Sequence, residues 1–217
     1  MKTIVAFFTV TLIAFASYGQ HPVIQDLNKV ASVTFPDTPK AQTIKTFTIY
    51  VLKKDDLVYL AEATPVNENL RDMVSPGTVD STYNGFIKGI IKSTNGKLIY
   101  RKSIIFNGIT GLEFETVGSK KEQKFYSHHR VFYFNHTLID NSVLYVDSLQ
   151  KNDKRIHLFL NSLKLTIDRS KVRQGNSEEL GYLTGKIIGF LIVIAVIVAV
   201  IGLFVFLIIK MANRPKH

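Results

Sequence analysis

The chain contains no cysteine among its 217 residues, and this absence restricts both its structure and its chemistry. No disulfide can form, so an exported domain of this chain would have to be held together by its core alone. Catalysis by a thiol and attachment of a lipid through a cysteine are excluded for the same reason.

Motifs with a known catalytic mechanism are also missing. The sequence has neither G-x-S-x-G nor H-E-x-x-H, the patterns of an exposed serine nucleophile and of a zinc protease. The stretch GYLTGK at 181–186 has three residues between its glycines where a phosphate loop needs four, and Ile187 follows in place of Ser or Thr. We therefore expect no catalytic residues, no cofactor and no enzymatic activity.

Histidines are the remaining candidates for a metal site. His128 and His129 are consecutive residues of a predicted strand, so they point to opposite faces and cannot share a metal as neighbours. His136 would lie ~26 Å from His128 if the strand continued. We expect these residues and His157 to be structural or surface histidines, and we expect no metal site.

A long apolar run occupies the C-terminal part of the chain. Residues 187–209 include no charged, amide or hydroxyl side chain. At ~1.5 Å per residue such a helix is ~34 Å long, enough to cross a hydrocarbon core of ~30 Å. We predict a transmembrane helix at 186–210, in contact with the lipid bilayer through 187–209. Because basic residues and no acid follow it, the short tail at 211–217 is predicted to be cytoplasmic.

The N-terminal residues have the pattern of a secretory signal. A single basic residue, Lys2, precedes an apolar stretch from Ile4 to Ala16, and small residues follow. We predict a signal peptide at 1–19, with cleavage after Ala16 as a second choice of site. An uncleaved signal anchor is the alternative, and it would give two spans.

Two further domain boundaries follow from these ends. Residues 20–165 are predicted to form one extracytoplasmic domain, followed by a polar juxtamembrane stalk at 166–185. The formal net charge of +10 belongs partly to the ends, since 22 basic and 17 acidic residues remain when the five basic residues at the ends are set aside. This mild excess indicates an ordinary solvated surface in the first place, with an acidic partner or anionic headgroups as alternatives, and no basic cluster indicates nucleic acid.

Alternating apolar and polar residues predict a mostly antiparallel domain. The period changes to that of a helix at 78–94 and again at 152–165, where Asn152 or Asp153 is a candidate N-cap. Asp55 and Asp56 are predicted to be exposed acids of a turn. Strands are predicted at 31–35, 43–52, 57–66, 97–106, 111–117, 124–134 and 143–149, with a loop from 135 to 141. About seven hairpin-linked strands covered by helices indicate the α+β class.

A family resemblance follows from three of these features. The first strand ends in FPDTP, a helix is inserted after the third strand, and the last helix continues into FLNSLKL. The region from Lys29 to Thr166 thus resembles the Mog/PsbP-like α/β/α sandwich. This resemblance implies an accessory or adaptor domain that docks on a macromolecule.

The sequence as a whole predicts a single-pass membrane protein whose outer domain binds an envelope protein through a sheet edge or loops. The rival hypothesis is an enzyme or small-ligand receptor whose site combines distant residues, such as His128 and His157 with aromatic side chains. A homodimer through the span is a further hypothesis. It rests on small residues four apart, Gly185 with Gly189 and Ala195 with Ala199.

Overall fold

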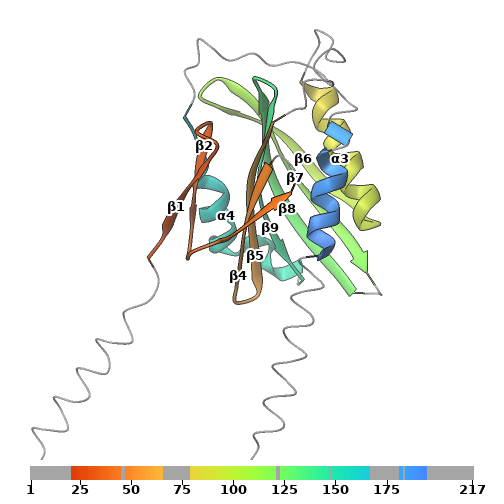
Figure 1. Cartoon of the computed structure of the whole chain (residues 1–217). Helices are drawn as coiled ribbons and strands as arrows, with labels where there is room; N and C mark the ends of the chain where they lie inside the picture. The colour runs from red at the N-terminus through yellow and green to blue at the C-terminus, as the bar shows by residue number, and fades with distance from the viewer. Residues whose placement is uncertain are drawn as a thin grey trace, which may run out of the picture.

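The computed structural model describes residues 21–44, 47–65, 79–120, 123–146, 148–166, 181–182 and 184–194 (Figure 1). The predicted signal peptide at 1–19 and tail at 211–217 lie outside these ranges. So do residues 167–180 of the predicted stalk and residues 195–210 of the predicted span.

A seven-stranded antiparallel sheet forms the centre of the fold, in the order β3-β4-β5-β9-β8-β7-β6. Its strands are β3 Lys40–Ile44, β4 Phe47–Lys54, β5 Leu57–Pro65, β6 Lys97–Phe106, β7 Ile109–Lys120, β8 Gln123–Phe134 and β9 Thr137–Tyr145. The predicted α+β class, with a mostly antiparallel sheet of about seven strands, is confirmed.

Helices and a small second sheet cover the two faces of this sheet. On one face lies α3 Asp80–Thr94, packed on β6 and β7. On the other lie α4 Lys154–Asn161, the 3₁₀ turn η1 Ser148–Asn152 and a three-stranded sheet of β1 Val23–Leu27, β2 Ala31–Phe35 and β10 Lys164–Leu165. Figure 1 shows α3 and α4 on opposite sides of the large sheet.

Strand β8 has apolar side chains on both faces, as the sequence predicts for an inner strand. Val131 and Tyr133 belong to the core under α3, whereas Phe132 and Phe134 belong to the core under α4. All four side chains are at most 1% exposed. The sheet is therefore buried on both sides along its middle strands.

Strand bounds differ from the predictions in several places. The predicted strand 143–149 ends at Tyr145, and Ser148–Asn152 forms η1. The predicted strand 43–52 is a hairpin of β3 and β4, with Ile44 opposite Phe47. Its connection, Lys45–Thr46, contains no Gly, Asn or Pro, so the sequence carries no turn signal there. Strand β7 continues through the predicted break at 118–119, and β1 forms in a segment for which no strand is predicted.

The predicted loop at 135–141 is wrong. Asn135 and His136 both have positive φ, 46° and 56°, which is the backbone of a tight two-residue hairpin turn. Strand β9 therefore begins at Thr137, and the polar residues Asp140 and Asn141 are buried in the sheet. In the sequence these two polar residues resemble those of a loop, because the groups that hydrogen-bond to them are distant along the chain.

The closing helix is shorter than predicted. Of the two candidate caps, Asp153 is the N-cap, since its side chain accepts a hydrogen bond from the Arg155 amide at 2.8 Å. The helix ends at Asn161, and the next residues add β10 to β2.

Residues 181–182 and 184–194 are helical and lie beside α3 (Figure 1). The first of these helical residues lie inside the segment predicted as a stalk. Ile188, Leu191 and Ile192 are 8% exposed or less and belong to the core under α3. Within the described ranges, no helix has both the length and the hydropathy needed to cross a membrane.

Candidate functional site

The outer edge of the large sheet is formed by β6, which among the described residues pairs only with β7. Its register shifts between Leu98 and Tyr100, so an irregularity interrupts the strand near its start. From Tyr100 to Phe106 the pairing is continuous. No strand in the described part of the chain pairs with the backbone groups on the outer side of this stretch, which is the arrangement that accepts an added strand.

Several side chains of β6 are apolar and exposed. Ile99 is 46% exposed, Ile105 75% and Phe106 37%. The strand also has Lys97, Arg101 and Lys102 but no acid. Basic residues commonly protect an edge from pairing, but large exposed apolar residues do the opposite. The edge therefore combines positive charge with an apolar surface.

A small hollow adjoins this edge. It has a volume of about 200 Å³ and is lined by Ile104, Ile105, Phe106, Arg130, Phe132 and Leu163. The lining is apolar except for Arg130. Such a hollow has room for one medium-sized apolar side chain, so it can serve as a specificity pocket beside a docked strand.

Behind the edge, Glu113 on β7 is the centre of a polar cluster on the α4 face. The Tyr100 hydroxyl donates to Glu113 Oε1 at 3.0 Å, and His128 Nε2 lies 3.3 Å from the same oxygen. Arg130 donates to Glu113 Oε2 from Nη2 at 2.6 Å and from Nε at 3.1 Å. The hydrogen bond from His128 holds the pKa of Glu113 well below its usual range; burial acts in the opposite direction, and the hydrogen bond and charge of Arg130 lower the pKa further.

Arg130 connects this cluster to the end of α4. Its Nη1 donates to the Leu160 carbonyl at 3.0 Å and to Asn161 Oδ1 at 2.8 Å. A cation at a helix C-terminus satisfies carbonyl groups that have no partner within the helix. Strands β6, β7 and β8 and helix α4 are thus joined through two side chains, Glu113 and Arg130.

A second carboxylate of β7 on the same face has its own partner. The Tyr145 hydroxyl donates to Glu115 Oε1 at 2.6 Å. Burial, followed by the charge and hydrogen bond of Glu115, raises the pKa of Tyr145 far above its usual value. Burial and the nearby Glu113 do the same to Tyr100. Both tyrosines are therefore neutral hydrogen-bond donors and not bases.

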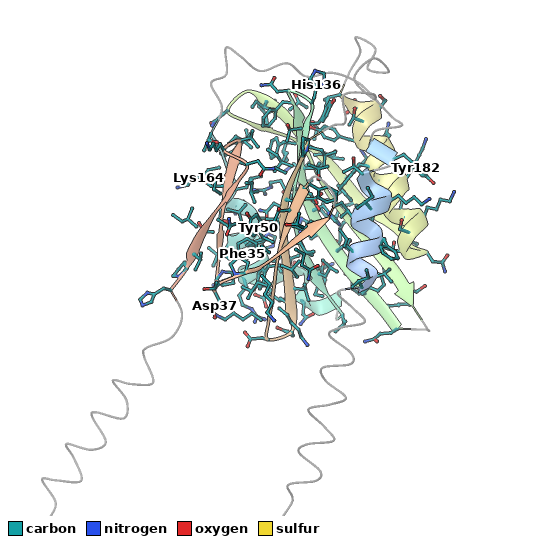
Figure 2. All side chains as sticks on the ribbon, in the orientation of Figure 1. Phe35, Asp37, Tyr50, His136, Lys164 and Tyr182 are labelled. Atoms are coloured by element: carbon teal, nitrogen blue, oxygen red, sulfur yellow. The ribbon has the colours of Figure 1, made fainter. Side chains whose placement is uncertain are left out.

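The structure brings together the two histidines of the rival hypothesis. The rings of His128 and His157 lie 6.1 Å apart, edge to face, and the ring of His128 also meets that of Tyr100 at 5.7 Å. No group of three potential ligand side chains could hold a metal ion in the part of the chain that the structure describes. His136 lies in the β8–β9 turn, at the upper end of the sheet in Figure 2.

His129 points to the other face, as predicted, and belongs to a buried network. Its Nδ1 lies 3.1 Å from both oxygens of Asp140, and its Nε2 lies 2.9 Å from Ser127 Oγ. This is the order of groups in a catalytic triad. However, all three residues are at most 2% exposed, and Phe114 stacks on the His129 ring at 4.6 Å. The arrangement is a packed core network rather than a site open to substrate.

A larger groove lies between the small sheet and α4. Its volume is about 470 Å³, and its apolar lining includes Phe35, Tyr59, Leu158 and Phe159. Burial raises the pKa of Tyr59 to about 12.

The two cations at this groove are already engaged. Lys54 Nζ donates to the Pro36 carbonyl at 3.1 Å, and Arg155 Nη2 lies 2.6 Å from Asp153 Oδ2 and 2.9 Å from Asp56 Oδ1. Asp55 and Asp56 form the turn between β4 and β5 and are exposed, as predicted. Neither His128 nor His157 lines the groove.

Sequence reasoning found β6 as a strand with its exact bounds but not its place at the sheet edge. Strand order depends on long-range pairing, which periodicity does not encode.

Proteins similar to this chain were found among solved structures. No family model matches the chain, and no curated protein matches it. Similar solved structures include the solution structure of cyanobacterial PsbP (CyanoP) from Synechocystis sp. PCC 6803, with 14% identity and a TM-score of 0.47 over 69% of this chain and 95% of that one. The PsbP-like resemblance is thus found again in the fold, at a level that carries no inference about function.

Two further solved structures are similar over about two thirds of the chain. A protein of unknown function, PA94, from Pseudomonas aeruginosa has 10% identity and a TM-score of 0.36, over 62% of this chain and 89% of that one. A protein from Bacteroides thetaiotaomicron VPI-5482 has 7% identity and a TM-score of 0.39, over 67% of this chain and 48% of that one.

Proposed function

We propose that this chain is a membrane-anchored extracytoplasmic domain that binds a partner protein without catalysis, by adding a partner strand to the edge of β6. The observation that carries the proposal is the combination of an open strand edge from Tyr100 to Phe106 with the exposed side chains of Ile105 and Phe106. Main-chain pairing at such an edge provides affinity, and pockets for alternate side chains provide specificity.

The chemistry of the edge defines the partner segment. Lys102 is exposed and β6 has no acid, so a complementary strand carries Asp or Glu. Arg101 is also exposed, but its guanidinium lies 3.8 Å from Asp80 of α3. The hollow beside Ile104 and Phe106 selects an apolar side chain on the same strand. The partner is therefore an extended segment that carries both acidic and apolar residues.

The cluster around Glu113 supports this function because it holds β6 in place. Edge strands are weakly held because only one neighbour pairs with them, and a template for strand addition must keep its register. The hydrogen bond from Tyr100 to Glu113 ties the start of the open edge to β7, and Arg130 ties β7 and β8 to α4. Each charged group of the cluster has a protein partner, so this chemistry favours support of the edge over catalysis.

Site-specific photo-crosslinking in intact cells tests the proposal. A photoreactive residue at position 105, on the open edge, is compared with one at position 158, because Leu158 on α4 is 70% exposed and lies away from β6. A discrete crosslinked protein obtained from position 105 and not from position 158 is the expected result. Equal crosslinking from both positions, or none from position 105, contradicts the proposal.

The groove of about 470 Å³ is the observation that favours the second candidate function, a small-ligand receptor. Its size is in the range of ligand pockets, and its lining is mostly apolar. An apolar fluorescent dye that binds the folded domain and is lost in Leu158→Arg would favour this function. If the substitution leaves dye binding unchanged, the dye binds at another place on the domain.

A further inference from the structure

The helix at 181–194 packs unusually closely against α3. A methyl group built on Gly181 or on Gly185 would overlap the backbone of Thr82 or Phe86 of α3. Further along, a Cβ on Gly189 would lie 3.1 Å from the Cα of Ile90. The glycines that suggest a membrane dimer in the sequence thus serve a contact within the chain.

Both helices run in the same direction, and polar groups fix their register. Ser93 Oγ donates to the Lys186 carbonyl at 2.9 Å, and the Lys92 ammonium lies 5.7 Å from the centre of the Tyr182 ring. Figure 2 shows Tyr182 beside α3. Since residue 189 contacts Ile90 and Ser93, the last described turn of this helix lies level with the end of α3 at Thr94.

Apolar side chains of this helix lie on two different faces. One face is in the core under α3, as described above. On the other, Ile187 is 39% exposed, Phe190 61% and Ile194 37%. These three residues follow a spacing of three and four, so they form one stripe along the outer side of the helix. We call Ile187, Phe190 and Ile194 the outer stripe.

Basic residues surround the end of the fold at which residue 194, the last described residue of this helix, lies. Lys92 lies in the last turn of α3, and Lys97 follows the turn that leaves it. Lys124 lies at the same end of the sheet, because Lys97 is opposite Val117 and Lys124 is opposite Ser119. All three lysines are exposed. A bilayer with anionic headgroups is complementary to this combination of charge and apolar stripe.

The length of the C-terminal apolar run also indicates a lipid bilayer as the partner. The apolar run continues from residue 195 to residue 209. A helix of those fifteen residues would reach only ~22 Å, less than the ~30 Å of a hydrocarbon core. In a chain anchored in the membrane as proposed above, the missing length then comes from the preceding residues, which are packed on α3 and open to lipid on their other side.

We infer that the outer stripe lies in the surface of an anionic phospholipid bilayer while the helix stays packed on α3. The domain then sits directly on the membrane, with Lys92, Lys97 and Lys124 at the headgroups and no flexible spacer at 181–194. This inference concerns a different face from β6, and it stands or fails independently of strand addition.

The absence of tryptophan and cysteine from the chain permits a clean test. The full chain carries Phe190→Trp together with Ser93→Cys and Gly189→Cys, and it is reconstituted into phosphatidylglycerol vesicles whose acyl chains are brominated. A Cβ at position 189 would lie 2.6 Å from that of Ser93, so the two helices must separate by about 1 Å to reach the Cβ spacing of a disulfide. Leu158→Trp in the same background is the control, since position 158 is equally exposed but lies on α4.

The expected result is a disulfide between positions 93 and 189, with the probe at 190 quenched by lipid and the probe at 158 not quenched. Replacing Lys92, Lys97 and Lys124 by Gln should reduce the membrane-seated population by roughly fivefold for each charge removed. The inference is overturned if no disulfide forms in the membrane, or if the probe at 190 is quenched only after the disulfide is reduced. Equal quenching in phosphatidylcholine vesicles overturns the assignment to an anionic surface.

Discussion

Glu113 and Arg130 face each other across β7 and β8, with 2.6 Å between Oε2 and Nη2. This ion pair lies behind the open edge strand and joins it, through Tyr100, to the end of α4. The edge proposed to receive a partner strand is thus fixed by contacts on its inner side. The same contacts make the stability of this region depend on pH.

Glu113→Gln should flatten the acid limb of the stability profile. The pKa of Glu113 is lower in the folded domain than in the unfolded chain, where it is near 4.5. The ionised carboxylate therefore stabilises the fold above pH 4.5, and this stabilisation is lost as pH falls toward the pKa of the folded state. The wild-type chain should therefore lose more unfolding free energy than the variant between about pH 5 and pH 2. Urea unfolding at a series of pH values measures this difference. Parallel profiles for the two chains would show that the carboxylate is not held by these partners.

Glu62→Gln should have the opposite dependence. Glu62 on β5 is 2% exposed and lies opposite Asp140, and burial raises its pKa well above the usual value. The protonated form of Glu62 stabilises the fold below the pKa of the unfolded chain, near 4.5, and this stabilisation is lost as pH rises. The glutamine variant, which stays neutral, should be more stable than wild type at pH 8 and similar at pH 4. The free energies of unfolding of the two chains, measured at pH 4 and at pH 8, test this prediction. An equal difference between variant and wild type at both pH values would contradict it.

Gly185→Ala should destabilise the domain. The added methyl group overlaps the carbonyl group of Phe86, and overpacking of this kind costs about 1–3 kcal/mol. Phe190→Ala, on the outer side of the same helix, is the matched control and should change unfolding free energy by less than about 0.5 kcal/mol in detergent. Thermal unfolding in detergent compares the two. An unaffected Gly185→Ala would mean that residues 181–194 are not part of the core.

Lys102→Gln should weaken binding of the partner. Removing a positive charge at the rim of the docking edge slows association and reduces its dependence on salt. Lys164→Gln on β10, an exposed lysine of the small sheet, is the control. The yield of the crosslink from position 105 at low and high salt measures the effect. Equal loss in both variants would indicate a general effect of net charge.

The sequence predicts local structure better than it predicts pairing. The bounds of β6 are predicted exactly, and α3 within two residues, because each has a clear period and a turn signal at its ends. The start of β9 is missed because Asp140 and Asn141 are polar yet buried. Asp140 lies beside His129, and Asn141 donates to the Phe159 carbonyl at 3.1 Å.

The candidate site is predictable only in part, because strand pairing does not follow from local sequence patterns. Alternation along β7 places Glu113 and Glu115 on one face, and the structure confirms this placement. Their partners come from β6, β8 and β9, and those pairings follow from strand order. The close contact of 181–194 with α3 was not predicted, since an apolar run next to a polar segment has the same pattern whether lipid or protein covers it.

Amide hydrogen exchange along β6 tests strand addition most directly. The photo-crosslinked complex is purified, and its exchange is compared with that of the free chain, with the five-residue edge strand β3 as the internal reference. Strand addition predicts strong slowing of amides between Tyr100 and Phe106 and no change in β3. If the β6 amides exchange in the complex as fast as in the free chain, the partner does not pair with this edge.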